Sequence, residues 1–221
     1  MQKFDTTAPI SAVLDIPAGR VRIVADDRAD TTVEVLPADP SKSADVTSAE
    51  RTTIAYADGV LRIHTPASEK RLVGDTGSLE VTVRLPAGSR VEAKAAAAEL
   101  DGVGRLGDVA FEGAYRRVRI DEAASVRLTA VDGDVEVGRL GGPSEITTSR
   151  GDIRIAEAVG GTVVLRTESG DITVAAAAGV SAALDAGTGY GRVANALRSD
   201  GTAALDIRAT TSQGDITARS L

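Results

Sequence analysis

The chain has 221 residues, of which 43% are hydrophobic and only 2% aromatic, and its 32 acidic and 25 basic residues give a formal net charge of −7. This acidic balance opposes binding to a nucleic-acid phosphate backbone, and the lack of cysteine excludes a disulfide framework, a cysteine-ligated zinc site and a thiol nucleophile. A core built with so few aromatic residues must consist mainly of Ala, Val, Ile and Leu. We therefore expect a narrow aliphatic interior and no nucleic-acid partner.

The first ninety or so residues are predicted to form short β-strands, because apolar and polar residues alternate there between turn signals. The expected strands are 20–25, 31–36, 53–56, 60–64 and 79–85. Polar loops are expected over 37–43 and 67–77. The sequence predicts no helix, although the alanine-rich segments 94–100 and 175–178 keep a helical turn as an alternative. We expect residues 1–90 to be a less regular β region that caps the rest of the fold and is continuous with it.

A short repeat dominates residues 91–221. The tripeptide Gly-Asp-Val/Ile begins at positions 107, 133, 151, 170 and 214, and Gly191-Arg192-Val193 is a degenerate sixth copy. Successive copies begin 26, 18, 19, 21 and 23 residues apart, which is close to the length of one coil of a β-solenoid. Glycine pairs at 141–142 and 160–161 mark a second turn in the unit, and no Lys-Ser/Thr follows them as in a phosphate loop. The repeat predicts an all-β fold, a parallel β-helix (β-solenoid) with two strands and two turns per coil.

Period-two alternation after each Gly-Asp turn predicts which side chains point inward. Aliphatic residues recur at one equivalent position and again two residues later: Val135, Ile153, Ile172, Val193 and Ile216, then Val137, Ile155 and Val174. Equivalent positions of a solenoid lie on adjacent coils about 4.8 Å apart. We expect these residues to form aliphatic stacks, without which a single coil would not be stable.

The aspartates of the repeat pose the main chemical question. Their positions are Asp108, Asp134, Asp152, Asp171 and Asp215. Calcium-binding solenoids supply an aspartate about every nine residues, whereas this chain offers one in roughly twenty. The sequence favours turn chemistry, in which glycine adopts a positive φ and aspartate accepts hydrogen bonds from backbone N–H groups. Weak calcium binding at the surface stays an alternative.

The remaining candidate residues favour no enzyme. His64 has no local partner that would make it a general base or a metal ligand, so it is expected to be an ordinary strand residue. The pairs Asp26-Asp27 and Asp132/Asp134 could be the two carboxylates of a glycosidase or lyase. Three Tyr, two Phe and no Trp are too few for the aromatic platforms of such enzymes. We predict no catalytic, cofactor-binding or metal residues and no cofactor.

Two further features bear on partners. Arg116, Arg117 and Arg119 lie near Tyr115 and are expected to form a solvated face, with a docking role as the alternative. The chain stops at Leu221 soon after the last repeat. We therefore expect the C-terminal coil to expose its edge, which either pairs with a second copy or is blunted by its short strand.

The N-terminal segment shows no apolar run typical of a signal peptide, and no apolar segment is long enough to cross a membrane. The sequence as it stands predicts a cytoplasmic protein. Removal of a leader would make a surface location equally compatible with the same residues.

The phrase Ser-Gly-Asp-Ile at 169–172, its variants at 150–153 and 213–216, and the Leu-Pro-Ala-Gly segment at 85–88 resemble the bacterial putative-adhesin domains of unknown function. The resemblance covers residues 10–221 and implies a right-handed parallel β-helix with no catalytic or ligand residues to carry over. It favours a noncatalytic scaffold or adhesin-like protein-interaction module, whose partner is a protein or a second copy bound through an end coil or a flat sheet face. The alternative is a carbohydrate-binding or carbohydrate-cleaving β-helix protein.

Overall fold

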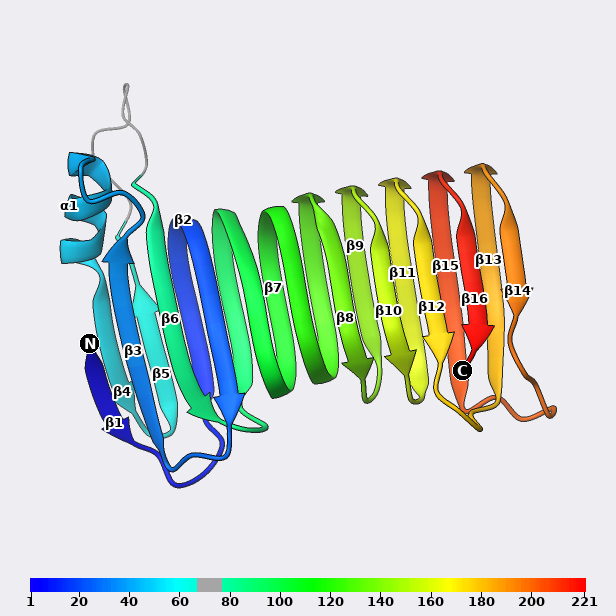
Figure 1. The fold of residues 1–221 in the computed structure, drawn as a ribbon, viewed down its shortest axis with the longest axis horizontal. Coiled ribbons are helices and arrows are strands. Elements are labelled where there is room, and N and C mark those ends of the chain that lie inside the picture. Colours follow the sequence, from blue (N-terminus) through cyan, green and yellow to red (C-terminus); the bar gives the residue numbers. More distant parts are fainter. Residues whose placement is uncertain (67–76) are drawn as a thin grey trace.

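In the computed structural model, which describes residues 1–66 and 77–221 and all but the side chains of residues 114 and 115, the chain forms a row of stacked β-coils (Figure 1). Nearly all of the predicted loop over 67–77 therefore lies outside the described residues. Each coil crosses two broad faces and turns at two corners. The aliphatic side chains between the faces form one continuous core.

The predicted strands are all present, although several are longer than expected. The elements are β1 (Gln2–Asp5), β2 (Ser11–Asp26), β3 (Asp30–Pro37), α1 (Ser43–Arg51), β4 (Thr53–Ala57), β5 (Val60–His64), β6 (Leu79–Pro86), β7 (Arg90–Asp132), β8 (Asp134–Leu140), β9 (Ser144–Arg150), β10 (Ile153–Ala158), β11 (Gly161–Ser169), β12 (Ile172–Ala176), β13 (Ala182–Tyr190), β14 (Val193–Ala196), β15 (Leu205–Gln213) and β16 (Ile216–Ser220). Among the described elements, α1 is the single helix, and it is too short to cross a membrane. The alanine-rich segment 94–100 lies within β7, so the helical alternative there is wrong.

The aliphatic stacks are confirmed by the strand register. Ile153 pairs with Val135 on one side and with Ile172 on the other, in parallel strands. Ile216 pairs with both Ile172 and Val193. The first four of these side chains are at most 1% exposed, and burying an aliphatic side chain of this size contributes about 1.5–3 kcal/mol. The coils are therefore stable because each one covers its neighbour.

The Gly-Asp copy at 107–109 is not equivalent to the other copies, so its grouping with them is wrong. Val135 pairs with Val118 in the preceding coil and not with Val109. Asp108 instead accepts a hydrogen bond from Ser125, which lies beside Val126 on the strands of the opposite face. The copy at 107–109 thus lies near the other corner of its coil. A tripeptide that specifies a turn does not specify which of the two corners it occupies.

The N-terminal end of the stack is closed by antiparallel strands. β3 pairs antiparallel with β6, β1 pairs antiparallel with β3, and β4 pairs antiparallel with β5, whereas the pairings from β2 onward are parallel. Helix α1 lies against β3 and β6 at this end. The outermost strands at this end run antiparallel to the strands they pair with, so the parallel stacking of coils ends here.

The sequence did not predict helix α1, because tertiary contacts hold it. Buried Asp45, in its first turn, accepts hydrogen bonds from the backbone N–H of Asp39 at 3.0 Å and from that of Ser78 at 2.8 Å. These bonds join the helix to residues on both sides of it in the sequence. A nine-residue helix is marginal by propensity alone, so its formation depends on such anchoring.

Neither the first nor the last coil of the sequence lies at an end of the stack. β2 lies between β7 and the pair formed by β5 and β6. In the same way, β15 lies between β11 and β13, and β16 lies between β12 and β14. In Figure 1 the red C-terminal strands accordingly lie between yellow and orange ones. The expectation that the C-terminal coil exposes its edge is therefore wrong, since the end coil is β13–β14.

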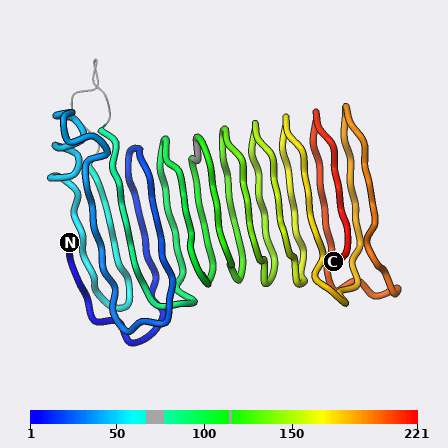
Figure 2. Tube along the Cα trace, in the orientation of Figure 1, coloured from blue at the N-terminus to red at the C-terminus, as the bar shows by residue number. Residues whose placement is uncertain are grey.

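The connection from the end coil back into the stack runs over residues 197–204 and can be followed in Figure 2. The N–H of Asp200 donates to Ser181 Oγ at 3.0 Å, and the Asp200 carboxylate accepts from the N–H of Thr202 at 3.2 Å. Hydrogen bonding to Ser181 and Thr202 holds the pKa of Asp200 below its ordinary value. The chain then finishes between its neighbours, where the N–H of Leu221 donates to the carbonyl of Ala176 at 3.0 Å.

This insertion predicts an unusual stability pattern near the C-terminus. Ile216 is 1% exposed and Val193 is 45% exposed, although Ile216 is much closer to the end of the chain. We expect Ile216→Ala to lower the free energy of unfolding by about 2–4 kcal/mol and Val193→Ala to lower it by about 1 kcal/mol or less. Urea denaturation of both variants measures this. Equal losses, or a larger loss at Val193, would contradict the inserted position of the last coil.

Candidate functional site

The corner that carries the Gly-Asp repeat is built by direct contact between backbones. Gly151 and Gly170 have φ values of 125° and 152°, which L side chains rarely adopt. A Cβ on Gly170 would lie 2.1 Å from the carbonyl oxygen of Gly151. The positive φ that the sequence predicts for these glycines is confirmed, and the contact shows a second reason for glycine: adjacent coils leave no space for a side chain.

The repeat aspartates form a hydrogen-bonded ladder along this corner. The backbone N–H of an aspartate on one coil donates to the Oδ1 atom of the aspartate on the neighbouring coil. The bonds run from Asp152 to Asp134 at 2.9 Å, from Asp171 to Asp152 at 2.8 Å, and from Asp215 to Asp171 at 2.7 Å. The N–H of Arg192 completes the ladder by donating to Asp215 at 2.8 Å. The predicted turn chemistry is confirmed for four aspartates, and Asp108 lies outside the ladder.

A parallel row of threonines supports the same corner, and the sequence reasoning missed it. Thr167 Oγ1 donates to the carbonyl of Gly151 at 3.2 Å, and Thr211 and Thr188 donate to the carbonyls of Gly170 and Gly214 at 3.1 and 2.9 Å. Each threonine stands three residues before a repeat glycine. The sequence therefore contains a Thr-x-x-Gly pattern at this corner. The alternation of apolar and polar residues predicts only that such a threonine faces inward, and it does not predict the hydrogen bond.

Replacing one threonine tests the contribution of this row. Thr167 is 6% exposed, so Thr167→Val removes a buried donor and leaves the Gly151 carbonyl without it. We expect the free energy of unfolding to fall by about 1–2 kcal/mol. Thr162→Val, at an exposed position on the same strand, serves as the control and should change stability by less than about 0.5 kcal/mol. Thermal denaturation of the two variants compares them, and equal effects would contradict the role of the hydroxyl.

The ladder also predicts how the protein responds to calcium. One oxygen of each ladder carboxylate already accepts a backbone hydrogen bond, and among residues 1–66 and 77–221 no cluster of three acidic or histidine side chains is placed to hold an ion. We expect millimolar calcium to leave the melting temperature unchanged relative to the protein in EDTA. A clear rise with calcium, abolished in Asp171→Asn, would show that the carboxylates bind the ion.

β2 and β7 each cross both faces. The basic cluster predicted at 116–119 takes part in ion pairs on the face formed by the second half of β2, residues 97–104 and 116–123 of β7, and β8, which we call the face of β2, β7 and β8. Arg116 lies 3.7 Å from Glu99, Arg117 lies 3.2 Å from Glu136, and Arg119 lies 3.7 Å from Asp121. The register places opposite charges on adjacent strands here, and opposite-charge neighbours stabilise a sheet. The cluster is therefore part of a neutralised, solvated face, and the side chain of Tyr115 lies outside the described residues.

The other predicted candidates are also engaged in local contacts. His64 Nδ1 lies 3.3 Å from Asp15 on the adjacent strand, and both side chains are more than half exposed. Asp132 pairs with Arg150 at 3.3 Å, while Asp134 belongs to the ladder. Asp26 lies 3.8 Å from Arg28. The carboxylates of Asp15, Asp26, Asp132 and Asp134 are thus all engaged in ion pairs or hydrogen bonds within the fold.

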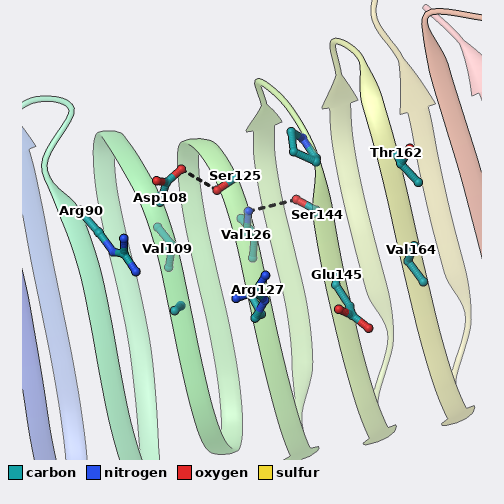
Figure 3. A pocket seen from close by; sticks show the side chains of 12 residues that line it. Arg90, Asp108, Val109, Ser125, Val126, Arg127, Ser144, Glu145, Thr162 and Val164 are labelled. Atoms are coloured by element: carbon teal, nitrogen blue, oxygen red, sulfur yellow. Dashed lines mark hydrogen bonds between the residues drawn. The ribbon is translucent and has the colours of Figure 1, made fainter.

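A shallow depression of about 420 Å³, which we call the Ala110 depression, lies on the opposite face (Figure 3). β7 supplies most of its wall, and β9, β11 and Pro143 in the turn before β9 supply the remainder. Its lining consists of Arg90, Asp108, Val109, Ala110, Ser125, Val126, Arg127, Pro143, Ser144, Glu145, Thr162 and Val164. Ala110 has a short side chain between long neighbours, which leaves the hollow.

Two arginines, Arg90 and Arg127, and two carboxylates, Asp108 and Glu145, line the Ala110 depression. Arg90 and Arg127 are both exposed, and Arg90 comes only within 3.9 Å of Glu92. Glu145 is in register with Arg127 but forms its ion pair with Arg166, at 3.1 Å. No ion pair among the described residues includes Arg127. A guanidinium without a carboxylate partner can bind an anionic group, and a carboxylate is a geometrically matched one.

The floor of the depression is fixed by hydrogen bonds. Ser125 donates to Asp108 Oδ1 at 2.6 Å, and the N–H of Val126 donates to Ser144 Oγ at 3.1 Å, as Figure 3 shows. The sequence reasoning did not find this surface, because its residues come from coils that are separated by about a coil length in the sequence. Charged, hydroxyl and small aliphatic side chains line it, whereas sugar sites are lined largely by aromatic ones.

Residues 88–219 match the family Toastrack DUF4097, and the chain belongs to this family. The family is of unknown function, in agreement with the resemblance carried by the Gly-Asp repeats. The match begins within the turn before β7 and includes the Ala110 depression, the aspartate ladder and the end coil. The comparison with curated proteins gave no match.

Several solved structures are similar over nearly the whole chain. A putative adhesin from Parabacteroides distasonis ATCC 8503 is 14% identical with a TM-score of 0.45, covering 98% of this chain and 95% of that one. A putative cell adhesion protein from Clostridium sporogenes ATCC 15579 is 12% identical with a TM-score of 0.43, covering 100% and 98% of the two chains. A putative adhesin from Bacteroides fragilis NCTC 9343 is 11% identical with a TM-score of 0.40, covering 98% and 95%. At this level of similarity no function is transferred.

Proposed function

We propose that the protein is a noncatalytic, adhesin-like module that binds a protein partner through the face carrying the Ala110 depression. The observation that supports this function is Arg127, an exposed guanidinium beside a hollow, with no carboxylate paired to it among the described residues. The proposed ligand group is an acidic side chain of the partner, placed over Ala110 between Arg90 and Arg127.

The pairing of the individual arginines supports the choice of Arg127. On the face of β2, β7 and β8, arginines are paired with carboxylates from neighbouring strands. A partner that binds there must break existing ion pairs before it gains new ones. On the face with the Ala110 depression, an acidic group reaches Arg127 without that cost. Because the chain has a net charge of −7, an acidic partner is repelled by the protein as a whole, and the unpaired guanidinium of Arg127 determines where it can approach.

The rigid stack suits binding by a preformed surface. The side chains around the depression project from strands that pair on both sides, so they lose little backbone freedom when a partner binds. The right-handed winding, the division at residue 90 and the cytoplasmic location remain predictions of the sequence.

A charge reversal tests the function. We expect Arg127→Glu to weaken binding of a partner captured from the native cell by at least about tenfold. The matched control is Arg154→Glu, an exposed arginine on β10 in the opposite face, which should leave binding unchanged. Captured partners are identified by mass spectrometry, and the affinity of the purified partner is then measured by calorimetry. Equal loss in both variants, or binding of glycans in place of a protein, would contradict the proposal.

A further inference from the structure

Among the coils of the described residues, the end coil β13–β14 is the one whose aliphatic column is left uncovered. Leu184 and Ala186 are in register with Ile207 and Ala209 of the neighbouring coil. Ile207 and Ala209 are 0% exposed, whereas Leu184 and Ala186 are only partly buried. Val193 is 45% exposed and Tyr190 is 79% exposed at the adjoining corner. The stack therefore presents apolar side chains at its C-terminal end.

Most of the hydrogen-bonding edge of this coil is also open, although the N–H of Ala182 at the start of β13 donates to the carbonyl of Arg198 at 3.0 Å. β13 pairs only with β15 and β14 only with β16 among the described strands. Exposed edges are usually protected by proline, lysine or a covering element, yet β13 and β14 contain neither of these residues. The ladder of aspartates also stops here, since Arg192 stands where the next carboxylate would be.

We propose that this end coil is the interface of a two-fold dimer in which two copies stack tail to tail. A single added strand could cover β13 or β14 but not both, because the two edges lie on opposite faces of the stack. A second copy offers two edges at the same separation. Rotation by 180° about an axis perpendicular to the faces places β13 against β13 and β14 against β14, both antiparallel, and joins the two aliphatic interiors.

The side chains of β13 are compatible with pairing to themselves. In an antiparallel pair, residues directly opposite must face the same side. A register centred on Ala186 uses the open part of the strand and places Leu184 opposite Thr188 of the other copy, so a larger side chain meets a smaller one. Gly187 and Gly189 leave the outer side of the strand flat. The strand is thus complementary to its own copy.

The other end of the molecule determines that the assembly closes at two copies. The antiparallel strands β1 and β4 and helix α1 occupy the N-terminal end, so an end coil has no matching coil to continue head to tail. A contact that uses the same surface on both copies closes on itself and does not grow into a fibre. The end surface of one coil is small, so we expect association at protein concentrations of roughly 10 to 500 µM.

Cross-linking through a single thiol tests the register. The chain has no cysteine, and antiparallel partners have Cα atoms about 4.5–5.5 Å apart, within disulfide range. We expect Ala186→Cys to form a covalent dimer under mild oxidation. The control is Val131→Cys, at a valine that is 58% exposed in the middle of the stack, and it should stay monomeric. Equal cross-linking of both variants, or of neither, would overturn the proposal.

Sedimentation equilibrium tests the interface without a cross-link. The native protein should show a monomer–dimer equilibrium, which Val193→Lys should weaken at least roughly tenfold by placing a charge in the interface. Val131→Lys is the matched control and should associate like the native protein, and thermal denaturation confirms that both variants are folded. A protein that is monomeric at every concentration, or that is affected equally by both variants, would show that the end coil is not the interface. None of these readouts depends on the binding partner of the Ala110 depression.

Discussion

The structure depends on the direct stacking of backbone on backbone at the glycine corner. At Gly170 the next coil lies so close that a Cβ would be 2.1 Å from the Gly151 carbonyl oxygen. This contact fixes the register between coils, because equivalent glycines must lie above one another. Parallel coils held in register place like residues next to like residues along the whole stack. The remaining features of the corner and of the two faces follow from that constraint.

Stacking like on like favours aliphatic side chains inside and is unfavourable for charges outside. The chain meets the second problem in two ways. On the face of β2, β7 and β8, residues of opposite charge alternate from coil to coil, as at Arg20 and Glu99, which lie 3.1 Å apart. At the corner, each aspartate lies next to another aspartate, and the backbone N–H of one coil donates to the carboxylate of the neighbouring one. The carboxylates are therefore part of the hydrogen bonding that joins coils.

The order in which the coils stack differs from their order in the sequence near both ends of the stack. β2 and the pair β15–β16 each lie between two other coils, so the last strands of the chain have neighbours on both sides and cannot fray singly, whereas β1 pairs only with β3 among the described strands. The C-terminal end of the stack is formed by β13 and β14, which are internal to the sequence, whereas the N-terminal end includes β1, the first strand of the chain. One end is closed by antiparallel strands and a helix, and the other leaves an open coil. This asymmetry is the basis for proposing one self-association surface that is separate from the partner-binding face.

The sequence by itself determined the coils. Glycine and aspartate at steps near twenty residues define corners, and period-two alternation defines which residues, such as Ile153 and Ile172, are buried, because both properties are local. Only the tertiary structure decided the order of the coils, the corner to which Gly107 belongs, helix α1 and the Ala110 depression. Each of these depends on which segments become neighbours, and coils of nearly identical pattern can be neighbours in more than one order. The local pattern is the same for Asp215 whether its coil lies at the end of the stack or, as observed, between Asp171 and Arg192.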